Sequence, residues 1–159
     1  MGKYAENTQV SSSQSRAEIE KTLSRYGADG FMYGWHDNQA VIAFTMKGKQ
    51  VKFILDLPDK NDNEFKYTPA RGTLRSEEQR LAEYEKSVKQ RWRALALVIK
   101  AKLEAVESGI TMFESEFLAH IVLPNGQTAG EYILPQIEES YNTGCMPPML
   151  PQLTERNKF

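Results

Sequence analysis

Cysteine and histidine are scarce in this sequence. Its 159 residues contain one cysteine, Cys145, and two histidines, His36 and His120. A single cysteine cannot form an internal disulfide and fits a reducing compartment. The histidines lie far apart, and no CxxC or HxxxH spacing occurs, so the sequence lacks the ligand spacing of a zinc site. We therefore expect no metal site and no cofactor.

Long apolar runs and a large net charge are also absent. No run approaches the roughly 20 residues that span a bilayer, and the start MGKYAENTQV lacks the apolar core of a signal peptide. The net charge of −1 gives no global attraction to nucleic acid or to an anionic membrane. We expect a cytoplasmic protein with no membrane partner, in which any binding of nucleic acid depends on a local cluster of charge.

The usual catalytic motifs are missing as well. The chain has no Walker A loop, no GxGxxG and no GxSxG, which are the common marks of phosphate-binding loops and of serine nucleophiles. Asp56, Asp59 and Asp62 gather at the end of a predicted strand, but their spacing does not match an EF-hand loop. The sequence therefore gives no reason to assign an enzyme, and no catalytic residue is predicted.

What the sequence does contain is one long amphipathic segment, residues 76–110. Its apolar positions recur in steps of three and four residues, a period of about 3.67 that is close to a straight α-helix. These positions are Leu81, Tyr84, Val88, Trp92, Leu95, Ile99, Leu103, Val106 and Ile110. Ser76 and Gln79 match a capping box at its start, and Gly109 is placed to end it. The apolar stripe is wide, so homo-oligomerisation through this helix is one hypothesis.

The region before this helix predicts a short helix and three strands. Ser15 and Glu18 match a capping box, and Gly27 ends the helix. Residues 31–35, 41–46 and 51–57 read as strands separated by short turn signals, so they form an antiparallel meander. Residues 58–75 read as a long loop, and a loop of this length is either functional or disordered.

Two shorter helices are predicted after the long one. Thr111 with Glu114, and Thr128 with Glu131, match capping boxes. Ile133, Ile137 and Tyr141 share one face of the second of these helices, Pro135 lies inside it, and Gly144 ends it.

The predicted fold class is therefore α+β. It comprises a short N-terminal helix, a three-stranded antiparallel meander, a long central helix, two shorter C-terminal helices and an irregular tail rich in proline and methionine. Residues 1–14 are expected to be a mobile N-terminal arm, residues 15–145 a single domain, and residues 146–159 the tail. Met146, Met149, Leu150 and Leu153 could dock that tail in extended form.

Basic side chains on and near the long helix are the first candidate binding site. At about 100° per residue, four of them fall within about 60° of one another and extend over about 20 Å: Lys86, Lys89, Arg93 and Lys100. Arg71 and Arg75 precede the helix, and Lys47 and Lys49 occupy a strand turn. These residues predict contacts to the phosphates of single-stranded DNA or RNA. The alternative is an ordinary solvated helix face, which a long helix needs in any case.

The first strand carries the second candidate site. Phe31, Tyr33 and Trp35 alternate, so they project from one face of the sheet. Beside lysines, such an aromatic row is suited to stacking of single-stranded bases. A sheet must also bury one face under helices, and aromatic side chains commonly fill that layer. On this second interpretation Trp35 packs against Trp92 or Tyr26.

Three stretches resemble small proteins of bacteriophage and prophage genomes, namely RWRALALVIKAKLEAVESGI, EFLAHIVLPNGQTAGEY and MPPML. This resemblance implies a phage origin and no catalytic activity. The order of strands and helix also resembles, at fold level only, that of phage single-strand annealing proteins and double-stranded-RNA-binding domains. Two hypotheses follow: a nucleic-acid-associated protein of phage recombination or replication, or a protein-binding module that inhibits or recruits a host protein.

Overall fold

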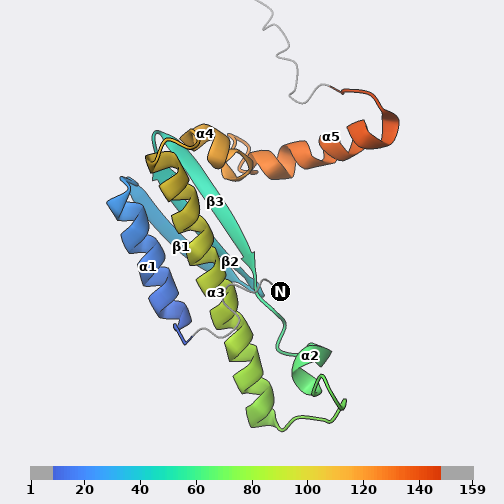
Figure 1. Cartoon of the computed structure of the whole chain (residues 1–159). Helices are drawn as coiled ribbons and strands as arrows, with labels where there is room; N and C mark the ends of the chain where they lie inside the picture. Colours follow the sequence, from blue (N-terminus) through green and yellow to red (C-terminus); the bar gives the residue numbers. More distant parts are fainter. Residues whose placement is uncertain (1–8, 148–159) are drawn as a thin grey trace, which may run out of the picture.

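The structure, a computed structural model, describes residues 9–147. It has the predicted α+β architecture, in which two helices lie against one face of a three-stranded sheet (Figure 1). The elements are α1 (Ser12–Arg25), β1 (Gly30–His36), β2 (Gln39–Met46), β3 (Lys49–Asp56), α2 (Asn63–Lys66), α3 (Glu77–Glu107), α4 (Phe113–Glu116), η2 (Leu118–His120) and α5 (Ala129–Thr143).

The sheet is the predicted antiparallel meander, in the order β1-β2-β3. Its register pairs Tyr33 with Ile42, and Ile42 with Phe53, so these side chains share the face that α1 and α3 cover. The turn between β2 and β3 places Lys47 and Gly48 at φ 50° and 71°. Positive φ at both positions matches the twist of adjacent strands and allows a two-residue connection.

The hydrophobic core lies between this sheet face and the two helices. Trp92 and Ile99 of α3 are 2% and 0% exposed, and Leu23 of α1 is 0% exposed. On the sheet side Phe44 and Val51 are buried in the same cluster. The middle of the α3 stripe is therefore buried as the periodicity predicts.

The two ends of the α3 stripe are not buried. Leu81 is 54% exposed and Ile110 is 80% exposed, while Tyr84 and Val88 are half-buried. The first turns of α3 extend beyond the sheet, where the loop that carries α2 lies against them (Figure 1). The chain thus leaves apolar surface on its longest helix.

Both ends of α3 follow the sequence signals. Ser76 accepts a hydrogen bond from the Gln79 backbone N–H at 3.2 Å, and the Gln79 side chain accepts one from the Ser76 N–H at 3.1 Å. At the other end Gly109 adopts φ 71°. The N–H groups of Gly109 and Ile110 donate to the carbonyls of Val106 and Ala105, which completes a Schellman motif.

The start of α1 differs from the prediction. Ser11 is the N-cap and Gln14 its capping-box partner, so the helix begins at Ser12, inside the segment predicted to be a mobile arm. Ser15 cannot cap because it is fully buried inside the helix. Glu18 instead forms an ion pair with Arg93 of α3. Two overlapping capping-box patterns were present, and tertiary contacts select the earlier one.

Residues 58–75 form a folded loop. They contain the short helix α2 and an isolated bridge between Tyr67 and Leu74. The Arg75 guanidinium donates hydrogen bonds to the carbonyls of Glu64 and Tyr67 at 2.8 and 3.0 Å. Phe65 is 4% exposed and meets the Tyr84 ring of α3 edge-on, with 5.8 Å between ring centroids.

The capping box predicted at Thr111 and Glu114, where the C-terminal part begins, is also wrong. Met112, not Thr111, precedes α4, and no side chain caps this four-residue helix. Glu114, the predicted capping partner, forms an ion pair with Lys49 at 3.2 Å. The predicted box at Thr128 and Glu131 is correct and opens α5, and Gly144 ends that helix at φ 69°.

A short turn joins these helices to the sheet. Ile121 forms a bridge to Val51 of β3, and Val122 forms a bridge to Thr128. Lys52 of β3 donates to the Gly126 carbonyl at 3.2 Å and lies 3.7 Å from the Glu131 carboxylate. These contacts fix the first turn of α5, and the rest of α5 extends away from the body (Figure 1). Met149, Leu150 and Leu153, predicted to dock, lie outside the described residues.

Candidate interaction surfaces

The four cations of the predicted row share one flank of α3 but differ in their contacts. Arg93 is engaged by Glu18 of α1 and bridges the two helices. Lys86, Lys89 and Lys100 have no carboxylate within 4.0 Å in the described part of the chain. Lys86 and Lys100 are exposed, and Lys89 is half-buried. Three of the four predicted side chains can therefore reach an outside partner.

Most of the other predicted cations stabilise the fold. The Arg75 guanidinium holds the 58–75 loop, and Lys49 is paired with Glu114. The Lys47 Nζ lies 5.8 Å from the centroid of the Phe113 ring, a cation–π distance. Arg71 is exposed in the turn of the loop. The structure does not gather these four residues into one surface with the α3 lysines.

The aromatic row of β1 is split between two roles. Tyr33 meets the buried Trp92 edge-to-face, with 5.6 Å between ring centroids, and the Arg16 guanidinium lies 4.9 Å from its ring. Phe31 packs against the core. Trp35 is 73% exposed, so the expectation that it packs against Trp92 or Tyr26 is wrong. The Arg16 guanidinium of α1 also lies 5.3 Å from the centroid of the Trp92 ring, so Arg16 and Tyr33 both approach that ring.

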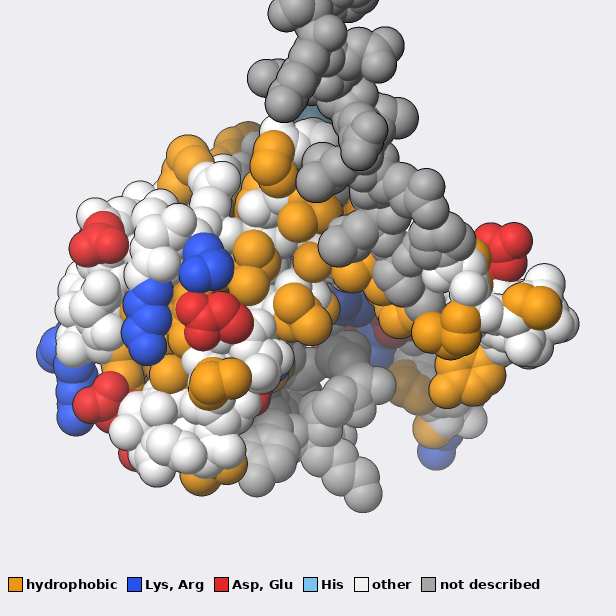
Figure 2. Space-filling view, turned by 90° about the horizontal axis from the view of Figure 1, so that it is seen from above, with side chains coloured by type: hydrophobic (Ala, Val, Ile, Leu, Met, Phe, Trp, Pro, Cys, Tyr) orange, Lys and Arg blue, Asp and Glu red, His pale blue; other side chains and the backbone are white. Residues whose placement is uncertain are grey.

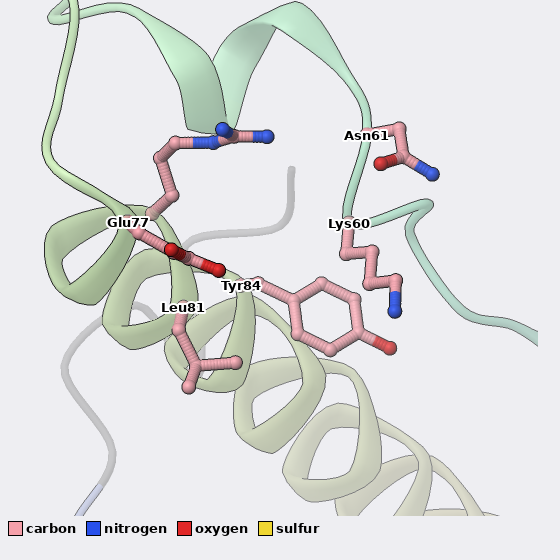
Figure 3. Close-up of a pocket in the computed structure, with 6 residues that line it drawn as sticks. Lys60, Asn61, Glu77, Leu81 and Tyr84 are labelled. Atoms are coloured by element: carbon pink, nitrogen blue, oxygen red, sulfur yellow. The ribbon is translucent and has the colours of Figure 1, made fainter.

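Two shallow pockets flank the first half of α3. The pocket in Figure 3 lies between this helix and the 58–75 loop, has a volume of about 240 Å³, and places Lys60 beside the ring of Tyr84. The second pocket, here called the α3 groove, also measures about 240 Å³. It lies between the start of α1 and α3 and is lined by Ser12, Tyr84, Glu85, Val88 and Lys89.

The largest accumulation of exposed apolar side chains lies in the C-terminal part of the chain. Seven large side chains between residues 110 and 146 are at least 37% exposed. They are Ile110, Met112, Leu118, Leu134, Ile137, Tyr141 and Met146, and we call them the C-terminal surface. Figure 2 shows hydrophobic side chains on this end of the body and along the segment that extends from it. Exposed apolar groups in such number mark interaction sites more often than plain solvent-facing surface.

Helix α5 carries the part of this surface that projects farthest. Ala129 is the one buried residue of α5, and Gly130 packs so closely on η2 that an added Cβ would lie 2.9 Å from the Ala119 carbonyl oxygen. Beyond that first turn Leu134, Ile137 and Tyr141 are 58%, 37% and 88% exposed. Their spacing places them within about 60° on one side of the helix, and we call them the α5 apolar face.

The C-terminal part is also strongly acidic, a signal that sequence reasoning missed. Residues 103–155 contain eight glutamates and no lysine or arginine. Residues 1–102 contain 18 basic and 13 acidic residues, a net charge of +5. The overall charge of −1 hides this segregation, because the two parts nearly cancel. Counting charged residues segment by segment along the sequence reveals this difference, which the total net charge does not show.

Two glutamates of this region have lowered pKa values, and each of them is paired with a lysine of β3. The pKa of Glu131 is lowered mainly by a hydrogen bond from the Thr128 backbone N–H, and to a smaller extent by one from the Thr128 hydroxyl. The pKa of Glu114 is lowered by the backbone N–H at its own position and by the Lys49 side chain. His120 stacks on Phe53 with 4.1 Å between ring centroids, and burial lowers its pKa. The folded state therefore favours the charged form of these two carboxylates and the neutral form of this histidine.

No chemistry of a metal centre is apparent in the described residues. Residues 9–147 contain no group of three or more histidine, cysteine, aspartate or glutamate side chains arranged to hold a metal ion. In the same range no helix is long and apolar enough to cross a lipid bilayer. Cys145 is an exposed free thiol just past the end of α5.

Comparison of the chain with protein-family models, with curated proteins and with solved structures gives no match. The resemblance to small phage proteins therefore stays a prediction.

Proposed function

We propose that this protein is a protein-binding module whose contact surface is centred on α5. The observation that carries the proposal is the α5 apolar face, because Leu134, Ile137 and Tyr141 are 58%, 37% and 88% exposed on a helix that extends away from the body (Figure 1). Full burial of one leucine or isoleucine side chain is worth about 1.5–3 kcal/mol. A partner that covers this face therefore gains several kcal/mol before any polar contact.

The charge of the C-terminal part defines the chemistry of the partner. Glu138 flanks the α5 apolar face, whereas Glu139 lies nearly opposite it on the helix. Three other glutamates of the C-terminal part are already paired with lysines. The charge that α5 offers a partner therefore comes from Glu138 and Glu139, and it favours a basic partner over an acidic one. The surface thus fits an apolar groove with a basic rim. Such an amphipathic helix in a groove is a common mode of recognition.

The test compares two leucine variants as bait in extracts of the native cells treated with nuclease. Leu134→Asp places a charge on the α5 apolar face. Leu74→Asp is the matched control, since Leu74 is 65% exposed in the 58–75 loop. We expect wild type and Leu74→Asp to retain the same proteins, and Leu134→Asp to lose them while its circular dichroism is unchanged. Identical retention by all three would contradict the proposal.

A second function, binding of single-stranded DNA or RNA, is favoured by one observation. Lys86, Lys89 and Lys100 line one flank of α3 without ion-pair partners in the described chain. They extend over about 21 Å at 1.5 Å per residue, which is enough to meet several phosphates. The exposed Trp35 offers one ring for stacking a base.

The structure changes how this second function is tested. Reversing Arg93 would break its pair with Glu18 and disturb the packing of α1 on α3. The informative variant is Lys86→Glu with Lys100→Glu, and Lys21→Glu on α1 is a control. If the protein binds nucleic acid, affinity for single-stranded oligonucleotides falls with salt, and the double variant loses both affinity and part of the salt slope. Equal affinity of the double variant and the control would exclude the α3 row.

A further inference from the structure

We infer that the outer edge of β1 is a docking site for an extended segment of another protein, which adds to the sheet as a fourth strand. This edge is separate from α5, so the inference goes beyond the proposed function. The sheet order β1-β2-β3 leaves β1 with a single neighbouring strand among residues 9–147, and six of its seven residues are exposed. A peptide that pairs with such an edge gains main-chain hydrogen bonds to it.

The pairing with β2 shows which backbone groups of β1 face outward. A two-residue turn with Asp37 at φ 51° joins the two strands, so the pair that closes the turn, His36 and Gln39, is hydrogen-bonded. Bonded and non-bonded pairs alternate along an antiparallel ladder. Every second residue of β1 therefore turns its N–H and C=O groups away from β2, where they have no hydrogen-bond partner in the described part of the chain. These residues are Phe31, Tyr33 and Trp35.

The opposite edge of the same sheet is protected. The Val122 N–H donates a hydrogen bond to the Gln50 carbonyl of β3 at 2.8 Å. Charged side chains on an edge strand hinder pairing with another chain, and β3 carries Lys49, Lys52 and Asp56. By contrast, β1 has no lysine, arginine, aspartate, glutamate or proline, and its pairing with β2 is continuous over residues 30–36. The fold thus protects one edge and leaves the other open.

The side chains at this edge suit an apolar segment that carries a carboxylate. Tyr33 and Trp35 are 37% and 73% exposed on one face of β1, and Met32 is 59% exposed on the other. Aromatic pairs across neighbouring strands stabilise a sheet. The Arg16 guanidinium lies 4.9 Å from the centroid of the Tyr33 ring and has no carboxylate within 4.0 Å among residues 9–147. An added strand with apolar residues beside Trp35 and an acidic residue near Arg16 fits this edge.

A second copy of β1 fits the edge less well than a single peptide. Full antiparallel overlap of two copies of residues 30–36 would pair Tyr33 with itself at a two-fold axis. Both Arg16 side chains, each beside its own Tyr33, would then meet near that axis, where like charges repel. Helix α1 lies beside α3 on the β1 side of the sheet (Figure 1), so a second body would also bring a second α1 to this edge. An extended segment brings neither.

Amide hydrogen exchange of the full chain alone, followed by NMR, is the first test. The outward amides of Phe31, Tyr33 and Trp35 should exchange fast, and those of Met32 and Gly34 slowly, at every protein concentration. Protection of the outward amides that grows with concentration would show a second copy at the edge and overturn the inference. Protection that is lost when residues 1–8 are deleted would also overturn it, because the chain would then fill its own edge.

The second test uses a random library of 12-residue peptides, selected for binding to the full chain. Selected peptides should protect the three outward amides and carry apolar residues at alternate positions. Trp35→Pro removes one outward N–H and Trp35→Ala keeps it, while both remove the ring. Proline is tolerated where the N–H of an edge strand faces solvent. Peptides should bind Trp35→Pro at least about fivefold more weakly than Trp35→Ala, as expected for one main-chain hydrogen bond.

A library that yields no binder, or binders that leave the outward amides unprotected, would overturn the inference. So would equal affinity of the two Trp35 variants when their circular dichroism is the same. If Trp35→Pro does not fold, protection of the wild-type amides by the peptides decides the question. Leu134→Asp should bind the peptides as wild type does, because α5 is anchored beside Lys52 at the other side of the sheet. Loss of peptide affinity in Leu134→Asp would place the peptides on α5 and overturn the inference.

Discussion

At the scale of single residues, the two tryptophans have different roles. Trp92 is part of the hydrophobic core, and Trp35 lies on the surface. Trp92 is 2% exposed and contacts the ring of Tyr33, whereas Trp35 on the same sheet face as Tyr33 is 73% exposed. The alternation of the first strand correctly placed Tyr33 and Trp35 on one face. It could not show that Arg16 would cover Tyr33 and leave Trp35 open, because that depends on where α1 crosses the sheet.

The first prediction compares these two residues. Trp92→Ala should lower the free energy of unfolding by about 3–5 kcal/mol, because it leaves a large cavity in the core. Trp35→Ala should change it by no more than about 0.5 kcal/mol, as for other exposed side chains. Urea unfolding followed by circular dichroism measures both values. Similar losses in the two variants would mean that Trp35 is buried in solution.

The second prediction concerns His120 and pH. Burial, with a smaller contribution from Lys102, lowers the pKa of His120 below its ordinary value of 6.5. The folded state therefore favours the neutral ring. Above pH 6.5 the ring is neutral in the unfolded chain as well, so the lowered pKa does not reduce the free energy of unfolding there. As the pH falls below 6.5, the unfolded chain binds a proton more readily than the folded one, and stability decreases.

Urea unfolding at neutral pH and at a pH of about 5 tests this sign. His120→Gln keeps a polar side chain of similar reach but cannot be protonated. Its stability should fall less between the two pH values than that of wild type. A wild-type protein that gains stability on acidification relative to His120→Gln would show that the sign is wrong.

At the scale of elements, capping boxes were accurate only where no tertiary contact competed. Ser76 and Thr128 cap α3 and α5 as predicted, with Gln79 and Glu131 as partners. The capping box predicted at Thr111 does not form, because the Thr111 hydroxyl donates to the Met112 carbonyl and Glu114 forms an ion pair with Lys49. Strand number, strand order and the α3 helix follow from periodicity and turn residues, which act locally.

The third prediction compares Ser76, which caps α3 as predicted, with Thr111, which does not cap α4. Ser76→Ala should destabilise the protein by about 1 kcal/mol, because two backbone N–H groups at the start of α3 depend on this capping box. Thr111→Ala should cost much less, since Thr111 accepts no helix N–H. Thermal unfolding of the two variants side by side measures the difference. A larger loss for Thr111→Ala would contradict the assignment of Met112 as the residue before α4.

Part of the candidate interaction surface on α5 could also be predicted from the sequence. The lack of lysine and arginine from residue 103 to residue 155 is visible in the sequence. The exposure of the α5 apolar face is not, because Leu134, Ile137 and Tyr141 would show the same spacing in a helix packed inside the core. Only the path of α5, which leaves the body after its first turn, shows that the rest of residues 9–147 leaves this face exposed.

At the scale of the whole molecule, charge is segregated along the chain, and exposed apolar side chains are densest in the C-terminal part. The first 102 residues carry a net charge of +5 and form the packed helix-and-sheet layers. The following part is acidic and carries seven of the exposed large apolar side chains. A monomer gains nothing from exposing such a surface, and a contact with a basic apolar partner would bury it.

The measurement that tests this account most directly is photo-crosslinking from position 134. A photoreactive amino acid replaces Leu134 in the full chain, and a second protein carries it at Leu74, which is similarly exposed. Illumination in native cell extract should give a covalent adduct from position 134 and none from position 74. An adduct of twice the chain mass identifies self-docking, and any other mass identifies a different protein partner. The same weak labelling from both positions would contradict the claim that α5 is a protein contact surface.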